Sequence, residues 1–216
     1  PSVAAYVGGD VTSGVLASKL YEAVALSLFL DVGTNGEIVL GNKDFMMTDA
    51  CSAGPALEGA GIRCGMRAMP GAIEDVRVSS RTLEPTVKVI GDVPPLGICG
   101  SGLISAVAEM LVTGVISRGG KIDVELVRSR QPERPRVRTG DAGPEFVLAW
   151  AEDSGGGTDI ALSEVDLENL IRVKAAIYAG IVVLAQKSGI PLEAVEQVLI
   201  GGAFGQHINV EQAIQI

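Results

Sequence analysis

SLFLDVGTNGEIVL, residues 27–40, is the stretch that decides the fold. Its first six residues form a short apolar run that contains Asp31, and Gly33-Thr34-Asn35-Gly36 separates this run from the apolar residues 37–40. Two apolar runs across a short turn rich in Gly and Asn predict a β-hairpin. A further run at 45–48, after a second turn, extends the prediction to a β-meander.

The turn of this hairpin has the composition of an anion site. A tight turn of Gly and Thr can direct successive backbone N–H groups at one point, and the hydroxyl of Thr34 adds a donor. Asp31 ends the first strand, where its carboxylate can hold a water molecule of the Mg²⁺ that accompanies a nucleoside triphosphate. A plain hairpin without a ligand stays open as the alternative for this segment alone.

A second glycine motif follows roughly 170 residues later. Residues 198–200 predict a brief strand that leads into Gly201-Gly202-Ala203-Phe204. A glycine pair lets a flat base and ribose lie against the backbone. A long helix is expected before this strand, from an N-cap at Ser163 to Gly189, and it is expected to be mostly buried.

The rest of the chain alternates between predicted strands and helices. The other predicted elements are a helix at 11–20 running towards 26, short helices at 55–58 and after 191, strands at 73–78, 86–90 and 146–150, and a helix at 103–113. Strands at the front followed by alternating helices and strands indicate an α/β fold with a mixed sheet and flanking helices.

Two segments allow more than one interpretation. The loop Gly97–Gly102 feeds a helix N-terminus, so its glycines either offer amides to a ligand or permit close helix packing. The arginine-rich segment 128–138 is interpreted as an exposed connection, with a docking patch for an acidic partner as the alternative. The glycines at 155–157 are interpreted as a turn, and His207 as structural or solvent-facing.

Composition excludes several classes of function. A net charge of −9 over 216 residues argues against nucleic acid as a partner. Cys51, Cys64 and Cys99 are too widely spaced for a disulfide framework or a metal site, so they are interpreted as small buried residues in a reducing, cytoplasmic compartment.

The longest apolar run is too short to cross a membrane. The chain begins at Pro1 without Met, and we expect a fragment of a longer protein.

Several sequence blocks resemble one family. VGGD at 7–10, DVGTNGEIVLGN at 31–42, the glycine-rich block 51–73, GICGSGLI at 97–104 and GGAFGQHIN at 201–209 are similar to the C-terminal domain of the reductive activators of corrinoid proteins. That family belongs to the actin-like ATPases with a ribonuclease-H-like fold. The resemblance implies a single actin-like domain over 1–216, the second lobe of the ATPase, with a lobe-connecting helical segment at 1–26.

The resemblance also implies roles for individual residues. Gly33, Thr34, Asn35 and Gly36 would hold phosphate, Asp31 the water shell of Mg²⁺, and Gly201, Gly202, Ala203 and Phe204 the adenosine of ATP. Asp10 would orient the attacking water, with a helix cap or a solvated carboxylate as the alternative. Glu58 and the Gly97–Gly102 loop are further candidates for lining the nucleotide or a partner surface.

At the level of the whole protein, the resemblance implies an ATPase that returns the Co(II) corrinoid of methyltransferase systems to Co(I). The partner would be a corrinoid protein, and the electrons would pass through a [2Fe-2S] domain, whose C-x₄-C-x₂-C spacing this chain lacks. The first phosphate loop would also lie outside the chain. A phosphotransferase of the sugar- or acyl-kinase kind and a non-catalytic docking or dimerisation module stay open, as does a homodimer.

Overall fold

The computed structural model describes residues 7–216, and of Ala203, Phe204 and Gln206 it describes only the backbone. The chain forms two compact units. Unit 1 comprises residues 7–54 and Arg172–Gln206, and unit 2 comprises Pro55–Ile171 and His207–Ile216. That residues 1–216 make a single domain stays a prediction.

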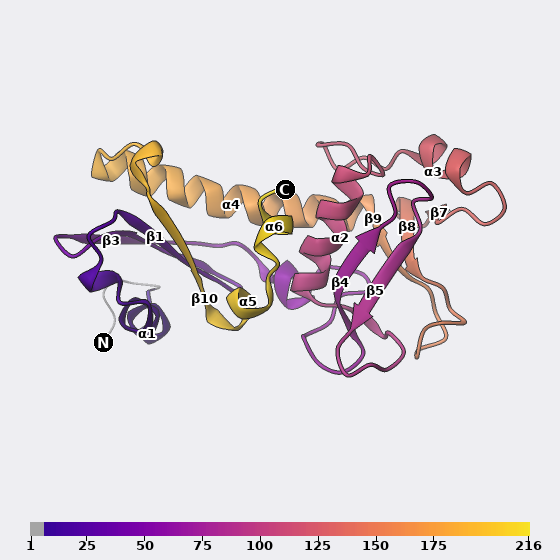
Figure 1. The fold of residues 1–216 in the computed structure, drawn as a ribbon, viewed down its shortest axis with the longest axis horizontal. Helices are drawn as coiled ribbons and strands as arrows, with labels where there is room; N and C mark the ends of the chain where they lie inside the picture. The colour runs from indigo at the N-terminus through magenta and orange to yellow at the C-terminus, as the bar shows by residue number, and fades with distance from the viewer. Residues whose placement is uncertain (1–6) are drawn as a thin grey trace. The chain divides into compact units, whose positions relative to one another are not determined.

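Unit 1 is built around a four-stranded sheet. Its elements are α1 (Gly9–Ser18), η1 (Leu20–Glu22), β1 (Ser27–Val32), β2 (Gly36–Gly41), β3 (Met46–Cys51), the C-terminal part of α4 (Glu164–Ser188), η3 (Leu192–Ala194), β10 (Gln197–Gly201) and most of α5 (Gly202–His207). The strand order is β10-β1-β2-β3, with β10 parallel to β1 and the other pairs antiparallel. The predicted mixed sheet and meander are therefore confirmed (Figure 1).

Alternating apolar residues give this sheet two buried faces. On one face Phe29 and Val39 pack with Val11 of α1 and Leu20 of η1. On the other face three strand residues, Leu28, Ile38 and Leu40, pack with Leu184 of α4. Successive residues of a strand point to opposite faces, which is why Val39 joins one cluster and its neighbours join the other.

Unit 2 contains two smaller sheets. Its elements are η2 (Pro55–Glu58), β4 (Ala72–Val78), β5 (Pro85–Val89), β6 (Gly97–Ile98), α2 (Gly100–Val112), α3 (Val124–Arg130), β7 (Val137–Gly140), β8 (Gly143–Ala149), β9 (Ile160–Ser163), the start of α4 and α6 (Val210–Ala213). The sheets have the orders β5-β4-β6 and β7-β8-β9. Helix α2 packs on β4, where the hydroxyl of Ser105 accepts a hydrogen bond of 2.7 Å from the backbone N–H of Val76.

The long helix α4 begins as its sequence predicts. The Ser163 hydroxyl accepts from the Asp166 N–H (3.2 Å), and the Asp166 carboxylate accepts from the Ser163 N–H (2.8 Å). These reciprocal bonds form the predicted N-terminal cap. The prediction that the helix is mostly buried is wrong, because Tyr178 is 60% exposed and Val183 is also exposed. In unit 1, Leu184 and Ile181 of the helix pack on the sheet, while Tyr178 and Val183 are exposed.

The exposed connection expected at 128–138 is confirmed for residues 131–136 and is shorter than predicted. Helix α3 extends to Arg130, and β7 begins at Val137. Three of the arginines have anionic partners: Arg134 pairs with Glu152 at 2.5 Å, Arg136 pairs with Glu84, and Arg138 pairs with Glu145 at 2.5 Å. These carboxylates neutralise the C-terminal part of the segment, while the docking patch stays an alternative for Arg128 and Arg130, which are exposed at the end of α3.

Candidate functional site

The sheet of unit 1 brings the two glycine motifs side by side. In the parallel pairing of β1 with β10, Asp31 is in register with Gly201. In the antiparallel pairing of β1 with β2, Asp31 is in register with Glu37 and Val32 with Gly36. Motifs that are roughly 170 residues apart in sequence therefore end on adjacent strands, as Figure 1 shows for β1 and β10.

The turn after Asp31 is fixed by two backbone hydrogen bonds. The Gly33 N–H donates to the Asn35 carbonyl at 2.9 Å, and the Gly54 N–H donates to the Thr34 carbonyl at 2.9 Å. Gly36 begins β2, where an added Cβ would lie 2.8 Å from the Cys51 sulfur. The amide of Gly33 thus closes the turn, and Gly36 has to be small because β3 packs against it.

The second motif approaches Asp31 closely. Gly202 has a φ of +73°, and a Cβ built on it would lie 2.5 Å from Oδ1 of Asp31. A Cβ on Gly201 would lie 2.4 Å from Cζ of Phe29. Both positions therefore require glycine, and at Gly202 any side chain would displace the carboxylate. Ala203 and Phe204 continue into α5, but their side chains lie outside the described residues.

Three carboxylates of unit 1 influence one another. Asp10 lies in the first turn of α1, and its Oδ1 accepts a hydrogen bond of 2.9 Å from the Val11 N–H. Burial and, secondarily, the negative charge of Asp10 raise the pKa of Asp31. Burial, followed by the charges of Asp10 and Asp31, raises the pKa of Glu37. Since like charges raise these pKa values, the three groups form an electrostatically coupled set.

Sequence reasoning missed Glu37. It lies on β2 directly opposite Asp31, and both are partly buried. The signal was available in the hairpin itself, because residues at equal distances from a turn pair across an antiparallel ladder and their side chains share one face. Applying the register to residues 31–37 would have added Glu37 to the candidate site.

The carboxylates of Asp31, Glu37 and Asp10 are candidates for holding a cation. Among residues 7–216, no group of three or more His, Cys, Asp or Glu side chains is arranged to bind a metal directly. Asp31 was predicted to act through a water molecule, which this observation leaves open. Within the same residues Asp31 and Glu37 form no ion pair, so their negative charge has no protein cation beside it. Partly buried, un-neutralised carboxylates next to a glycine backbone fit a hydrated cation.

The other candidates lie in unit 2, where their glycines serve packing. A Cβ on Gly100 would lie 2.2 Å from the Leu57 carbonyl oxygen, and one on Gly102 would lie 2.1 Å from that of Ile73. Close packing is therefore the supported interpretation of the Gly97–Gly102 loop. Glu58 lies in η2, and His207 is exposed at the end of α5, as predicted.

The three cysteines are free, but only Cys99 is fully buried. Cys51 and Cys64 are partly exposed, which corrects the prediction that all three are small core residues. The Cys51 thiol donates to the Gly36 carbonyl at 3.3 Å, and burial raises the pKa of this thiol. Cys51 therefore contributes to the packing beneath the turn.

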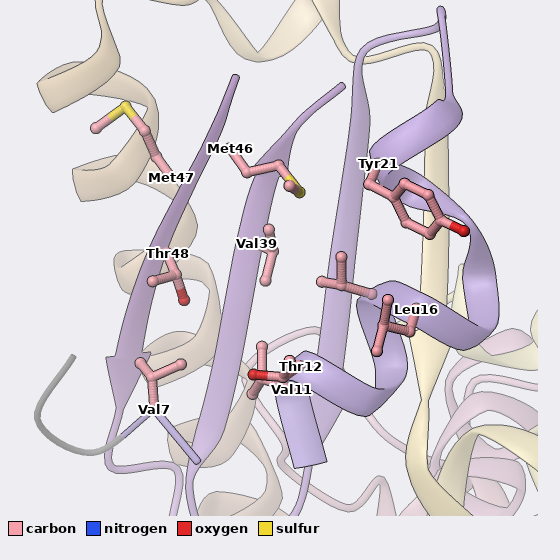
Figure 2. Close-up of a pocket in the computed structure, with 10 residues that line it drawn as sticks. Val7, Val11, Thr12, Leu16, Tyr21, Val39, Met46, Met47 and Thr48 are labelled. Carbon is pink, nitrogen blue, oxygen red and sulfur yellow. The ribbon is translucent and has the colours of Figure 1, made fainter. Parts of the chain in front are cut away.

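Unit 1 also contains an open apolar pocket of about 390 Å³ between α1 and strands β2 and β3 (Figure 2). Two of its hydroxyls are already engaged, because Thr48 donates to the Ile38 carbonyl at 2.9 Å and Thr12 to the Gly8 carbonyl at 3.5 Å. None of Asp31, the 33–36 turn or Gly201-Gly202 lines the pocket. It is therefore separate from the carboxylate site.

A mixed sheet with paired glycine turns beside a carboxylate is the arrangement of an actin-like ATPase domain, and comparison with known proteins gives the same class. Residues 25–216 match the family described as the C-terminal domain of RACo, the ASKHA domain. The chain belongs to this family. The predicted ribonuclease-H-like, actin-like fold is thereby confirmed.

Individual relatives have consistent names. The chain is 35% identical to the corrinoid activation enzyme RamQ of Eubacterium limosum over 99% of its own length. It is 30% identical, over the same share, to the [Co(II) methylated amine-specific corrinoid protein] reductase of Methanosarcina barkeri. A solved structure titled reductive activator for corrinoid, iron-sulfur protein superposes with a TM-score of 0.89 at 52% identity and covers 99% of the chain. The chain spans 35%, 38% and 33% of these three proteins, respectively.

No helix within residues 7–216 is both long and apolar enough to span a bilayer.

Proposed function

We propose that this chain is the ATP-binding module of a protein that reductively activates a corrinoid protein. The observation that carries the proposal is the register of β1, which puts Asp31 beside Gly201 and next to the turn at 33–36. Membership of the ASKHA family and the names of the relatives support the same function.

In this proposal the turn binds the phosphates of ATP. Thr34 and Asn35 supply donors at the tip, while Gly33 closes the turn through its N–H and Gly36 lets β3 pack beneath it. Gly201 and Gly202, with Ala203 and Phe204 after them, flank the adenosine.

Asp31 holds a water molecule of the Mg²⁺ shell. Bound Mg²⁺ supplies charge neutralisation for the phosphates. Because Asp31, Asp10 and Glu37 repel one another, a hydrated cation beside them lowers the electrostatic free energy of the whole set. Asp10 orients the attacking water, a role that needs a positioned carboxylate rather than a covalent step.

The coupled activity is ATP hydrolysis that assists reduction of the Co(II) corrinoid to Co(I). The chain itself has no C-x₄-C-x₂-C motif, so we place electron transfer in a [2Fe-2S] domain of the full-length protein. The first phosphate loop belongs to the other lobe in the same proposal. The partner is the corrinoid protein of a methyltransferase system, and free cysteines agree with a cytoplasmic location.

Isothermal titration of Mg·ATP into the protein tests the nucleotide site. We expect Asp31→Ala to weaken binding at least about tenfold, because it removes a charged contact to the metal shell. Asp44→Ala is the control, since Asp44 is an exposed carboxylate of unit 1 whose partner is Lys43. Equal affinity of the wild type and Asp31→Ala would contradict the site.

Turnover of the full-length protein separates the alternatives. Stimulation of ATP hydrolysis by a corrinoid protein supports the proposal. Stimulation by a small sugar or carboxylate acceptor alone indicates a phosphotransferase. A protein that binds no nucleotide would instead be a docking or dimerisation module, in which the glycine turns have only a structural role.

A further inference from the structure

Gly54 adopts a left-handed backbone conformation and contacts the candidate phosphate turn. It lies after β3 with a φ of +86°, and no atom lies within 4 Å of a Cβ built on it. Its N–H donates to the Thr34 carbonyl at 2.9 Å. Space is therefore not the reason for glycine here. The reason is the left-handed backbone conformation that aims this N–H at Thr34.

This hydrogen bond fixes the direction of a neighbouring donor. In a planar trans peptide, the carbonyl of one residue and the N–H of the next point in opposite directions. Because the Thr34 carbonyl is directed at Gly54, the Asn35 N–H points away from Gly54. The Gly33 N–H holds the following peptide through the Asn35 carbonyl. The peptides on both sides of Asn35 are therefore held in place before any ligand binds.

We propose that Gly54 is a positioning residue for phosphate binding, acting through the Thr34–Asn35 peptide to direct the Asn35 N–H at the ligand. The inference rests on the proposed nucleotide site and adds to it a residue that touches no ligand. A residue with a Cβ disfavours a φ of +86°, so it would turn the amide away from Thr34 and release the peptide. Pro55 restricts the backbone of Gly54 further, which limits any local compensation.

The test compares ATP with adenosine, which lacks phosphates. We expect Gly54→Ala to weaken ATP binding about tenfold, in line with the loss of one hydrogen bond to a charged group, and to change adenosine binding less than about twofold. Gly189→Ala is the matched control, because Gly189 also lies in unit 1, has a φ of +70° and has no atom within 4 Å of its Cβ. Gly54→Asn should restore part of the ATP affinity, since Asn tolerates positive φ better than Ala.

The outcomes separate the inference from the site it rests on. A wild-type protein that binds ATP no more tightly than adenosine overturns the proposed function and the inference with it. A wild type that prefers ATP, with Gly54→Ala weakening both ligands equally or neither, overturns the inference alone. A selective loss of ATP affinity in Gly54→Ala, absent from Gly189→Ala, supports it.

Discussion

Buried and partly buried carboxylates have different partners in the two units. In unit 2, Glu145 is only 2% exposed and is paired with Arg63 at 2.6 Å and Arg138 at 2.5 Å. In unit 1, Asp31 and Glu37 are partly buried beside Asp10, and within residues 7–216 neither forms an ion pair. Arginines thus neutralise the buried charge of Glu145, whereas Asp31, Glu37 and Asp10 are like charges that lie together.

Under the proposed function, the difference separates a carboxylate that stabilises the fold from carboxylates that would serve a ligand. A buried carboxylate with two arginines is satisfied without any further group. Burial, with the charge of Asp10 second, raises the pKa values of Asp31 and Glu37, and such raised pKa values in partly buried carboxylates are common at functional sites. Substitutions in the two units should therefore have opposite signatures in stability and in binding.

The largest loss of stability is expected from Glu145→Ala. Removing this buried carboxylate leaves Arg138 with Asp159 alone and takes the partner of Arg63, and because both arginines are partly exposed we expect unfolding to become easier by about 2–3 kcal/mol. Trp150, the sole tryptophan, lies in unit 2 and stacks under Arg134, so its fluorescence in urea measures this loss. Glu152→Ala, which breaks an exposed pair, should have a much smaller effect. Equal effects of the two substitutions would contradict the assignment.

A smaller loss is expected at the start of α4. The carboxylate of Asp166 accepts hydrogen bonds from the Arg63 N–H and the Ser163 N–H, both at 2.8 Å, and is buried. Asp166→Ala should cost about 2 kcal/mol, because two backbone donors lose their acceptor. The exposed cap Asp123 of α3 provides the comparison, with about 1 kcal/mol expected for Asp123→Ala. Urea denaturation followed by circular dichroism measures both, and a larger effect at Asp123 would refute this ranking.

Gly202→Ala should combine a moderate loss of stability with a loss of ligand binding. Its φ of +73° alone costs about 1–2 kcal/mol for a residue with a Cβ, and the Cβ would also press on Asp31. Gly157→Ala has a similar φ but open space around the Cβ, so it isolates the backbone cost. Thermal unfolding and Mg·ATP titration of both variants separate the backbone cost of the positive φ from the effect of the Cβ on Asp31. Unchanged ATP binding in Gly202→Ala would argue against the adenosine motif.

The smallest effect, of opposite sign, is expected from Asp31→Asn. The pKa of Asp31 is raised above its ordinary value of 3.8, so protonation of Asp31 contributes stability that is lost as pH rises through the folded-state pKa. Without ligand at neutral pH, Asp31→Asn should therefore be as stable as the wild type or more stable, by less than about 1 kcal/mol because solvent screens this partly exposed group. The difference should vanish below pH 3.8, where the wild type is protonated in both states. Thermal unfolding against pH measures it, and a destabilised variant at neutral pH would contradict the sign.

Local sequence signals predicted much of this fold. The hairpin at 27–40, the cap formed by Ser163 and Asp166, and the strand leading to Gly201-Gly202 all follow from turn chemistry and apolar patterning. These features depend on residues close in sequence. The juxtaposition of Asp31 with Gly201 is different, because it requires β10 to pair with β1. The sequence suggested that Asp31 and Gly201 lie together only because the order of the two motifs resembles that of the family.

The failed predictions have physical reasons. The composition of residues 128–138 concealed α3, whose N-cap, Asp123 bonded to the Leu126 N–H, lies upstream of the arginines. The apolar run within α4 suggested burial, but a sheet covers only one side of a helix and leaves Tyr178 exposed. Glu37 was missed because a motif names residues by type, whereas strand register decides which side chains meet.

The central claim is that the carboxylates of unit 1 are left un-neutralised for Mg·ATP. Calorimetric titration of Mg·ATP into the wild type and Asp31→Asn, with the unfolding temperature of each sample measured in parallel, tests it most directly. We expect a variant at least as stable as the wild type that binds Mg·ATP at least about tenfold more weakly. Equal affinity in the two proteins, or a variant that loses binding only because it unfolds, would show that these carboxylates do not serve Mg·ATP.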